Sequence, residues 1–127
     1  MSQLKVITLN DGETAVEFVP TGIDSNGVAT LTTNSGTVIA DKQLSNSVRM
    51  TQDRRKTLLK LQVPAVVTET VNGVSRVKLE RTGHIRIETD FSKLATRAER
   101  QSALNLAIAA LNEALFADTI VNNETIY

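Results

Sequence analysis

Lysines and arginines gather in one short stretch of the chain, between residues 42 and 60. They are Lys42, Arg49, Arg54, Arg55, Lys56 and Lys60, and Asp53 is the only acid among them. The net charge of the whole chain is zero, so this clustering, and not the total, indicates affinity for phosphate groups. Ser45 and Ser47 lie in the same stretch and offer hydroxyls that can hydrogen-bond to a base. The alternative is a solvated run of charge at the tip of a hairpin.

Residues suited to covalent or metal chemistry are scarce. The chain has no cysteine and a single histidine, His84, which excludes disulfides, thiolate chemistry and multi-histidine metal sites. Glu88 and Asp90 follow His84 closely, but no nucleophile-elbow motif accompanies them. No glycine-rich phosphate-binding motif occurs either. We therefore expect no catalytic residue, no metal, no cofactor and no small-molecule substrate.

The length of 127 residues indicates a single domain over residues 1–127. No apolar run approaches the roughly 20 residues that a membrane-spanning helix needs, and the first residues lack the apolar stretch of a signal peptide. These features predict a soluble, cytoplasmic protein without a membrane partner. Three phenylalanines and one tyrosine are too few for a sheet that stacks bases on aromatic side chains.

Strand patterns dominate the first two-thirds of the chain. The turn sequence Asn10-Asp11-Gly12 predicts an N-terminal β-hairpin within residues 1–20. An antiparallel sheet is expected over residues 27–91, with central strands at 43–51 and 56–63. Both strands alternate with a period of two, which is typical of a sheet with one covered and one open face. The open face is expected to carry Ser45, Ser47, Arg49, Lys56, Leu58 and Lys60.

Beyond residue 63 the strand pattern changes. Pro64 is expected to interrupt the strand, and Thr68–Arg76, which contain Asn72-Gly73, to form a hairpin loop. A long strand follows from Val77 to about Phe91. Its alternation places one set of polar side chains together, namely His84, Arg86 and Glu88.

The period becomes helical after Phe91. Thr96 and Glu99 match a capping box, and an apolar stripe predicts a helix over about 97–115. A short second helix is expected at about 118–122. These elements form a helical dimerisation region over 96–127. The fold class is α+β, and because one such helix cannot cover the sheet, a partner's helix should supply the missing cover in a homodimer.

Several segments, taken in order, resemble one family. Ser47-Val48-Arg49, a basic turn and Lys56-Thr57-Leu58-Leu59-Lys60-Leu61-Gln62-Val63-Pro64 resemble the central hairpin of coat proteins from small RNA bacteriophages, the leviviruses. Thr70-Val71-Asn72-Gly73-Val74, Ser25-Asn26-Gly27-Val28-Ala29 and the ending Ile126-Tyr127 are similar to further pieces of those proteins. No piece is specific alone, but together they run the length of the chain.

The resemblance implies an N-terminal hairpin, a five-stranded antiparallel sheet, and one long and one short C-terminal helix. It further implies an intertwined homodimer with a ten-stranded sheet, which assembles into an icosahedral shell in the bacterial host cytoplasm and becomes part of the virion. The open sheet face then binds a hairpin of single-stranded viral RNA, which represses translation and marks the genome for packaging.

The same resemblance assigns individual residues. An adenine-accepting pocket maps onto Val28, Ser45, Ser47, Leu58 and Lys60; phosphate contacts map onto Arg49 and Lys56; and the neighbouring strand contributes His84, Arg86 and Glu88. Shell contacts map onto the loop Thr68, Glu69, Thr70, Val71, Asn72, Gly73 and Val74. Two positions depart from the family: Leu58 replaces a hydroxyl residue, and His84 replaces a base-stacking tyrosine.

Four alternatives remain open at this level. A dimeric RNA-binding translational regulator that forms no shell would show the same sheet and the same basic face. His84 could equally be an ordinary surface histidine, and Lys56 could serve solubility alone. The loop from Thr68 could be a plain exposed hairpin.

Overall fold

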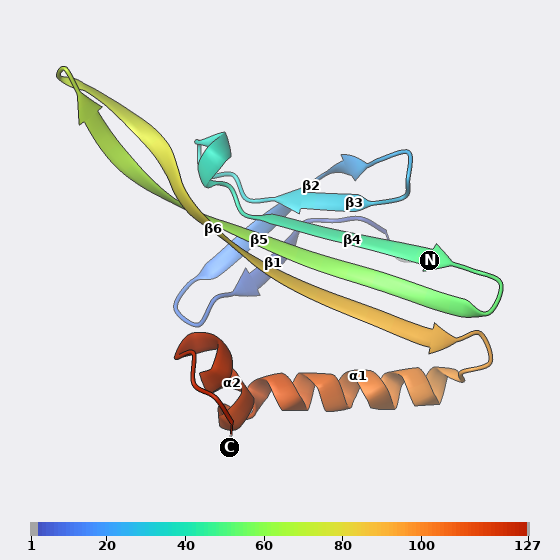
Figure 1. Ribbon diagram of the computed structural model, residues 1–127. Coiled ribbons are helices and arrows are strands. Elements are labelled where there is room, and N and C mark those ends of the chain that lie inside the picture. The colour runs from blue at the N-terminus through green and yellow to red at the C-terminus, as the bar shows by residue number, and fades with distance from the viewer. Residues whose placement is uncertain (1–2, 127) are drawn as a thin grey trace. The chain divides into compact units, whose positions relative to one another are not determined.

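The computed structural model describes residues 3–126 (Figure 1). Its elements are β1 (Ile7–Asn10), β2 (Ala15–Ile23), β3 (Ala29–Thr32), a short 3-10 turn (Val38–Ala40), β4 (Gln43–Met50), β5 (Arg54–Val71), β6 (Val74–Ser92), α1 (Arg97–Asn112) and α2 (Ala114–Val121). The chain divides into two compact units between Asp90 and Phe91. The α+β class and the order of strands before helices are confirmed. Residues 1, 2 and 127 of the predicted regions lie outside the described residues.

The N-terminal hairpin is continuous with the sheet. β1 pairs with β2 in antiparallel fashion, with Ile7 opposite Phe18. β2 then continues to pair with β3, across a shift in register between Pro20 and Gly22. Gly22 has a φ of 144°, a conformation that glycine adopts without steric cost. The sequence predicted a hairpin plus five strands. Over residues 3–126 the structure instead has six strands in the order β1 to β6, because β2 belongs both to the hairpin and to the sheet.

The pairing of β4 with β5 decides which side chains share a face. Ser45 lies opposite Lys60, Ser47 opposite Leu58, and Arg49 opposite Lys56. Residues directly opposite each other in an antiparallel pair project from the same side of the sheet. The predicted alternation is thus confirmed for this pair of strands, and we call the side that bears these residues the polar face.

Pro64 does not end its strand, contrary to the sequence-based expectation. β5 runs without a break from Arg54 to Val71, and the predicted loop from residue 68 to 76 shrinks to the turn Asn72-Gly73. Both turn residues have positive φ, 53° and 79°, as a type I′ hairpin turn requires. The strands could therefore extend to the turn from both sides.

Side-chain contacts link β5 to β6 on both sides of Pro64. Near the turn, Thr70 contacts Ser75 through their hydroxyls at 3.4 Å. Farther from the turn, Thr57 contacts Thr89. Pro64 lies between Thr57 and Thr70 within the continuous strand β5.

The hydrophobic core of the sheet unit lies on the face opposite the polar one. Within the described residues, its buried members are Phe18, Leu31 and Leu44, and Leu61 packs against them together with residues of β1 and β2. Leu31 is opposite Leu44, and Leu44 is opposite Leu61. In this register, apolar side chains of β3, β4 and β5 lie next to one another and form a continuous core.

The helical unit starts with the predicted cap. The backbone N–H of Glu99 donates to Thr96 Oγ1 at 3.2 Å, and the backbone N–H of Thr96 donates to Glu99 Oε2 at 2.9 Å. α1 ends at Asn112 and not at residue 115, because Glu113 adopts an extended conformation (φ −75°, ψ 129°). α2 begins directly after it and is longer than the expected 118–122.

Apolar side chains on both helices are exposed in the single chain. Neither helix has a buried residue, and Leu106 and Val121 are 70% and 74% exposed. In the part of the chain that the structure describes, no single helix is long and apolar enough to span a membrane; only α1 and α2 together reach that length, with a bend of 63° between them.

The contribution of the capping box to stability can be measured by substitution of Thr96. Replacing Thr96 with alanine should lower the free energy of unfolding by about 1 kcal/mol, because the N–H of Glu99 loses its acceptor. Replacing Thr96 with serine keeps the hydroxyl and should cost much less. Chemical denaturation of the two variants measures the difference. An equal loss of unfolding free energy in the alanine and serine variants would show that the hydroxyl of Thr96 does not stabilise the helix.

The connection between β3 and β4 is organised around Asp41. Its Oδ1 accepts hydrogen bonds from the Ser35 hydroxyl at 2.6 Å and from the Ser35 N–H at 2.8 Å. The side-chain bond from Ser35, followed by the backbone bond, lowers the pKa of Asp41 below its ordinary value of 3.8. The ionised carboxylate therefore holds this connection together.

A pH series tests that role. Because the pKa of Asp41 is lower in the folded state, its contribution to stability is present above 3.8 and is lost as the pH falls through the folded-state pKa. Asp41→Asn should melt at a lower temperature than the parent at neutral pH, and the difference should shrink in acid. A difference that stays constant down to the acid end would contradict this assignment.

Candidate RNA-binding face

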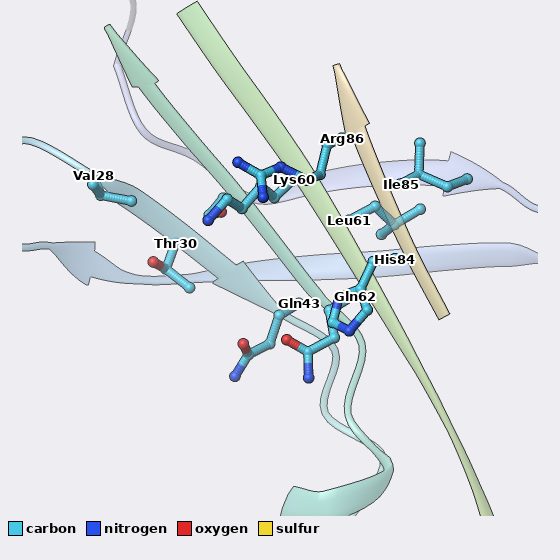
Figure 2. A pocket seen from close by; sticks show the side chains of 10 residues that line it. Val28, Thr30, Gln43, Lys60, Leu61, Gln62, His84, Ile85 and Arg86 are labelled. Carbon is cyan, nitrogen blue, oxygen red and sulfur yellow. The ribbon is translucent and has the colours of Figure 1, made fainter. Parts of the chain in front are cut away.

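Two hollows adjoin on the polar face. The first, which we call the His84 pocket, has a volume of about 600 Å³ and is lined by Val28, Thr30, Gln43, Ser45, Lys60, Leu61, Gln62, His84, Ile85 and Arg86 (Figure 2). The second, the Arg49 pocket, has a volume of about 720 Å³ and is lined by Asn26, Val28, Ser47, Val48, Arg49, Lys56, Thr57, Leu58, Glu88, Thr89 and Asp90. Val28, just before β3, borders both hollows.

All ten residues assigned to RNA from the sequence line these two pockets. β4 contributes the serines and Arg49, β5 contributes Lys56, Leu58 and Lys60, and β6 contributes the rest apart from Val28. The structure therefore brings together residues that lie up to sixty positions apart in the sequence. It does so because three adjacent antiparallel strands each present one side chain in two to the same face.

The contact between Thr57 and Thr89 gives the register across β5 and β6 on this part of the sheet. Counting from it, Lys60 lies opposite Arg86 and Gln62 lies opposite His84. Figure 2 shows the same neighbours, with Lys60 beside Arg86 and Gln62 beside His84. The His84 pocket thus combines two cations with an imidazole and two amides, those of Gln43 and Gln62.

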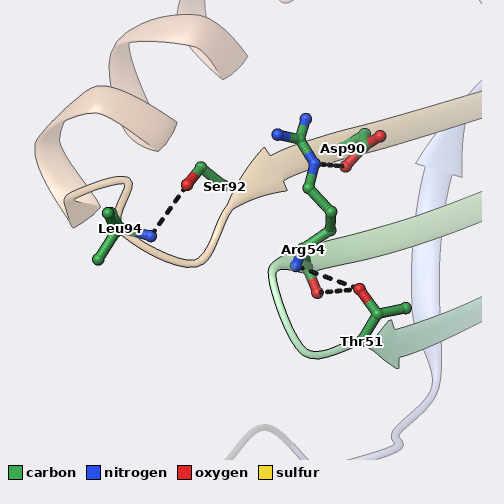
Figure 3. Close-up of polar contacts among 5 residues, drawn as sticks. All are labelled: Thr51, Arg54, Asp90, Ser92 and Leu94. Carbon is green, nitrogen blue, oxygen red and sulfur yellow. Dashed lines mark hydrogen bonds and ion pairs between the residues drawn. The ribbon is translucent and has the colours of Figure 1, made fainter.

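Some cations of the polar face form ion pairs with acidic side chains, and others do not. Arg86 Nη2 lies 3.3 Å from Glu88 Oε1, and Arg54 Nε lies 2.8 Å from Asp90 Oδ1 (Figure 3). Among the ion pairs of the described residues, none involves Arg49, Lys56 or Lys60. These cations are accordingly available to a polyanion. The described residues hold no group of three or more His, Asp or Glu that could bind a metal ion.

Several lining residues were absent from the sequence-based site. Gln43, Thr30 and Gln62 border the His84 pocket, and Asn26 and Asp90 border the Arg49 pocket. Gln43 lies two residues before Ser45 and Gln62 two residues after Lys60, so strand alternation puts both on the same face as those residues. Asn26 could not be placed in this way, because it lies in a turn without periodicity.

The predicted shell-contact segment, Thr68–Val74, lies elsewhere in the sheet unit. It comprises the end of β5, the turn and the start of β6, at the far end of that hairpin from the β4–β5 connection (Figure 1). None of its residues lines either pocket. An exposed ion pair, Arg76 Nη2 to Glu69 Oε2 at 3.3 Å, joins the two strands there.

Comparison with known proteins identifies a family with the sequence and fold of this chain. The levivirus coat protein family matches residues 2–127. The capsid protein of Pseudomonas phage PRR1 is 33% identical over 132 residues, which cover 99% of this chain and all of that protein. The virus-like particle of Beihai levi-like virus 21 is 25% identical, with a TM-score of 0.88 and 99% of both chains covered.

A second solved structure describes an unassembled form. It is an unassembled virus coat protein dimer, a bacteriophage RNA-binding dimer, which is 21% identical with a TM-score of 0.70 and 98% of both chains covered. Its likeness shows that the fold is shared. The family match over nearly the whole chain, together with the identity to the capsid protein of phage PRR1, shows which family this chain belongs to. This chain belongs to the levivirus coat protein family, a family of structural capsid proteins and not of enzymes.

Proposed function

We propose that this coat protein forms homodimers, that the dimers assemble into an icosahedral shell in the cytoplasm of a bacterial host, and that the polar face binds an RNA hairpin. Binding of the hairpin represses translation and selects the genome for packaging. The observation that carries the RNA-binding part is the shared face of the His84 and Arg49 pockets, which places unpaired cations beside short hydroxyls.

The side chains of the polar face can contribute different interactions to RNA binding. Arg49, Lys56 and Lys60 provide charge for phosphates, which contributes affinity without regard to sequence. Ser45 and Ser47 flank positions where an unpaired base can enter and accept or donate hydrogen bonds. Specific recognition of RNA favours loops and bulges whose bases can be splayed out in this way.

The two departures from the family pattern alter base recognition. Leu58 faces the Arg49 pocket with an aliphatic side chain, so it offers a base van der Waals contact and no hydrogen bond. His84 offers a ring that can stack, with a smaller surface than tyrosine. We therefore expect an operator hairpin that differs from those of tyrosine-bearing relatives.

Exposed apolar surface supports the dimer. Leu104, Leu111 and Leu115 are about half exposed on helices that bury no residue within the chain. A monomer that exposes so many apolar side chains is expected to associate. β6 is the last strand of the sheet, so its outer edge is open for pairing with a second copy. The unassembled coat protein dimer of similar fold agrees with this proposal.

The tip of the β5–β6 hairpin is proposed to make contacts between dimers. Its turn, Asn72-Gly73, is exposed together with Val71 and Val74, which are 43% and 67% exposed. Two exposed valines beside a rigid two-residue turn provide a small apolar surface that can pack against neighbouring subunits.

Expression of this chain alone in bacteria tests shell formation. Electron microscopy should show uniform particles, and RNA inside them should survive nuclease treatment of the intact particles. Dimers without particles would favour the translational regulator. Particles that hold no protected RNA would contradict the RNA-binding part.

A double substitution tests the polar face. Arg49→Ala combined with Lys60→Ala removes two cations, so affinity for a short oligouridine should fall by roughly tenfold or more, and the slope of log affinity against log salt should flatten by about 1.4. Lys78→Ala combined with Arg81→Ala removes the same charge from β6 outside both pockets and serves as the control. If both pairs weaken binding equally, the polar face is not the RNA site.

A further inference from the structure

The Arg49 pocket contains carboxylates as well as cations. Glu88 and Asp90 line it together with Arg49 and Lys56. A carboxylate in a phosphate-binding surface repels the ligand, so its presence there calls for a reason. The two carboxylates differ in their partners. Glu88 pairs with Arg86 of its own strand, whereas Asp90 pairs with Arg54 of a different strand.

The ion pair of Asp90 joins β6 to the beginning of β5. Arg54 Nε lies 2.8 Å from Asp90 Oδ1 (Figure 3), and Arg54 is also the residue whose backbone closes the β4–β5 turn onto Thr51. The two side chains are 47% and 49% exposed. Ion pairs with such exposure contribute little to stability, so the main effect of Asp90 is on the charge that the pocket presents.

We propose that Asp90, which lines the Arg49 pocket, is a specificity-determining residue. It neutralises Arg54, which precedes Lys56 by two residues on β5, and so limits sequence-blind binding of RNA. This inference rests on the proposed RNA-binding function. An arginine freed at this position would add one cation to the track formed by Arg49 and Lys56. An unstructured strand can shift along the face until a phosphate meets that cation. A hairpin held in place by base contacts has no such freedom.

Discrimination between RNAs is a difference of two affinities. A cation that any strand can reach raises the affinity of every competitor, whereas the intended hairpin gains only if its backbone already passes the same point. By pairing with Arg54, Asp90 keeps the sequence-blind part of the affinity low. Among the described ion pairs of this face, Arg54 and Arg86 have acidic partners, whereas Arg49, Lys56 and Lys60 have none.

The experiment is a mutant cycle on the full-length protein, with a short oligouridine as the sequence-blind probe. Asp90→Asn should bind it about fivefold more tightly at low salt and steepen the salt slope by about 0.7, the value for one additional phosphate contact on a single strand. Arg54→Gln should bind more weakly than the parent, because it leaves the carboxylate unpaired. The double variant should return close to the parent.

Glu69→Gln is the matched control. It also removes one carboxylate and releases an arginine, Arg76, from a 3.3 Å ion pair, but outside both pockets. The inference is overturned if Asp90→Asn leaves oligouridine affinity unchanged, if Glu69→Gln gives the same gain, or if the gain persists in the double variant. Melting temperatures confirm that all variants are folded.

The two sets of variants distinguish a failure of the inference about Asp90 from a failure of the proposed RNA-binding function. If Arg49→Ala with Lys60→Ala weakens RNA binding while Asp90→Asn changes nothing, the polar face is the RNA site and only the role of Asp90 fails. If the Arg49 and Lys60 substitutions act no more strongly than their control, the RNA-binding face itself is wrong.

Discussion

The register between β4 and β5 is the constraint on which the polar face depends. Because successive side chains of a strand alternate between faces, a slip of one residue would turn Arg49 and Ser47 toward the core side and expose Leu44. The core formed by Phe18, Leu31 and Leu44 makes such a slip costly. The same apolar contacts that stabilise the sheet therefore also hold the side chains of the polar face in place.

The small core has a second consequence. In residues 3–126 only three apolar side chains are buried, while the helices bury none. The single chain thus leaves much of its apolar surface in contact with water, and that surface can be covered when copies associate. Assembly and stability are then linked by the same side chains, as suits a protein of the levivirus coat family.

The polar face is basic, but acidic side chains neutralise some of its cations. Arg49, Lys56 and Lys60 lack acidic partners among the described ion pairs, whereas Arg54 and Arg86 each have one. Such a surface can keep its sequence-blind affinity for phosphate low and leave hydroxyls and rings to discriminate among bases.

The sequence by itself determined the α+β class, the capping box at Thr96, the alternation of β4 and β5 and the set of side chains on the open face, because these follow from local periodicity. Tertiary structure decided the rest. Pro64 was expected to end a strand, yet β5 continues through it from Arg54 to Val71. Asp90 was visible near His84, but its pairing with Arg54 across 36 positions depends on strand pairing, which no local pattern contains.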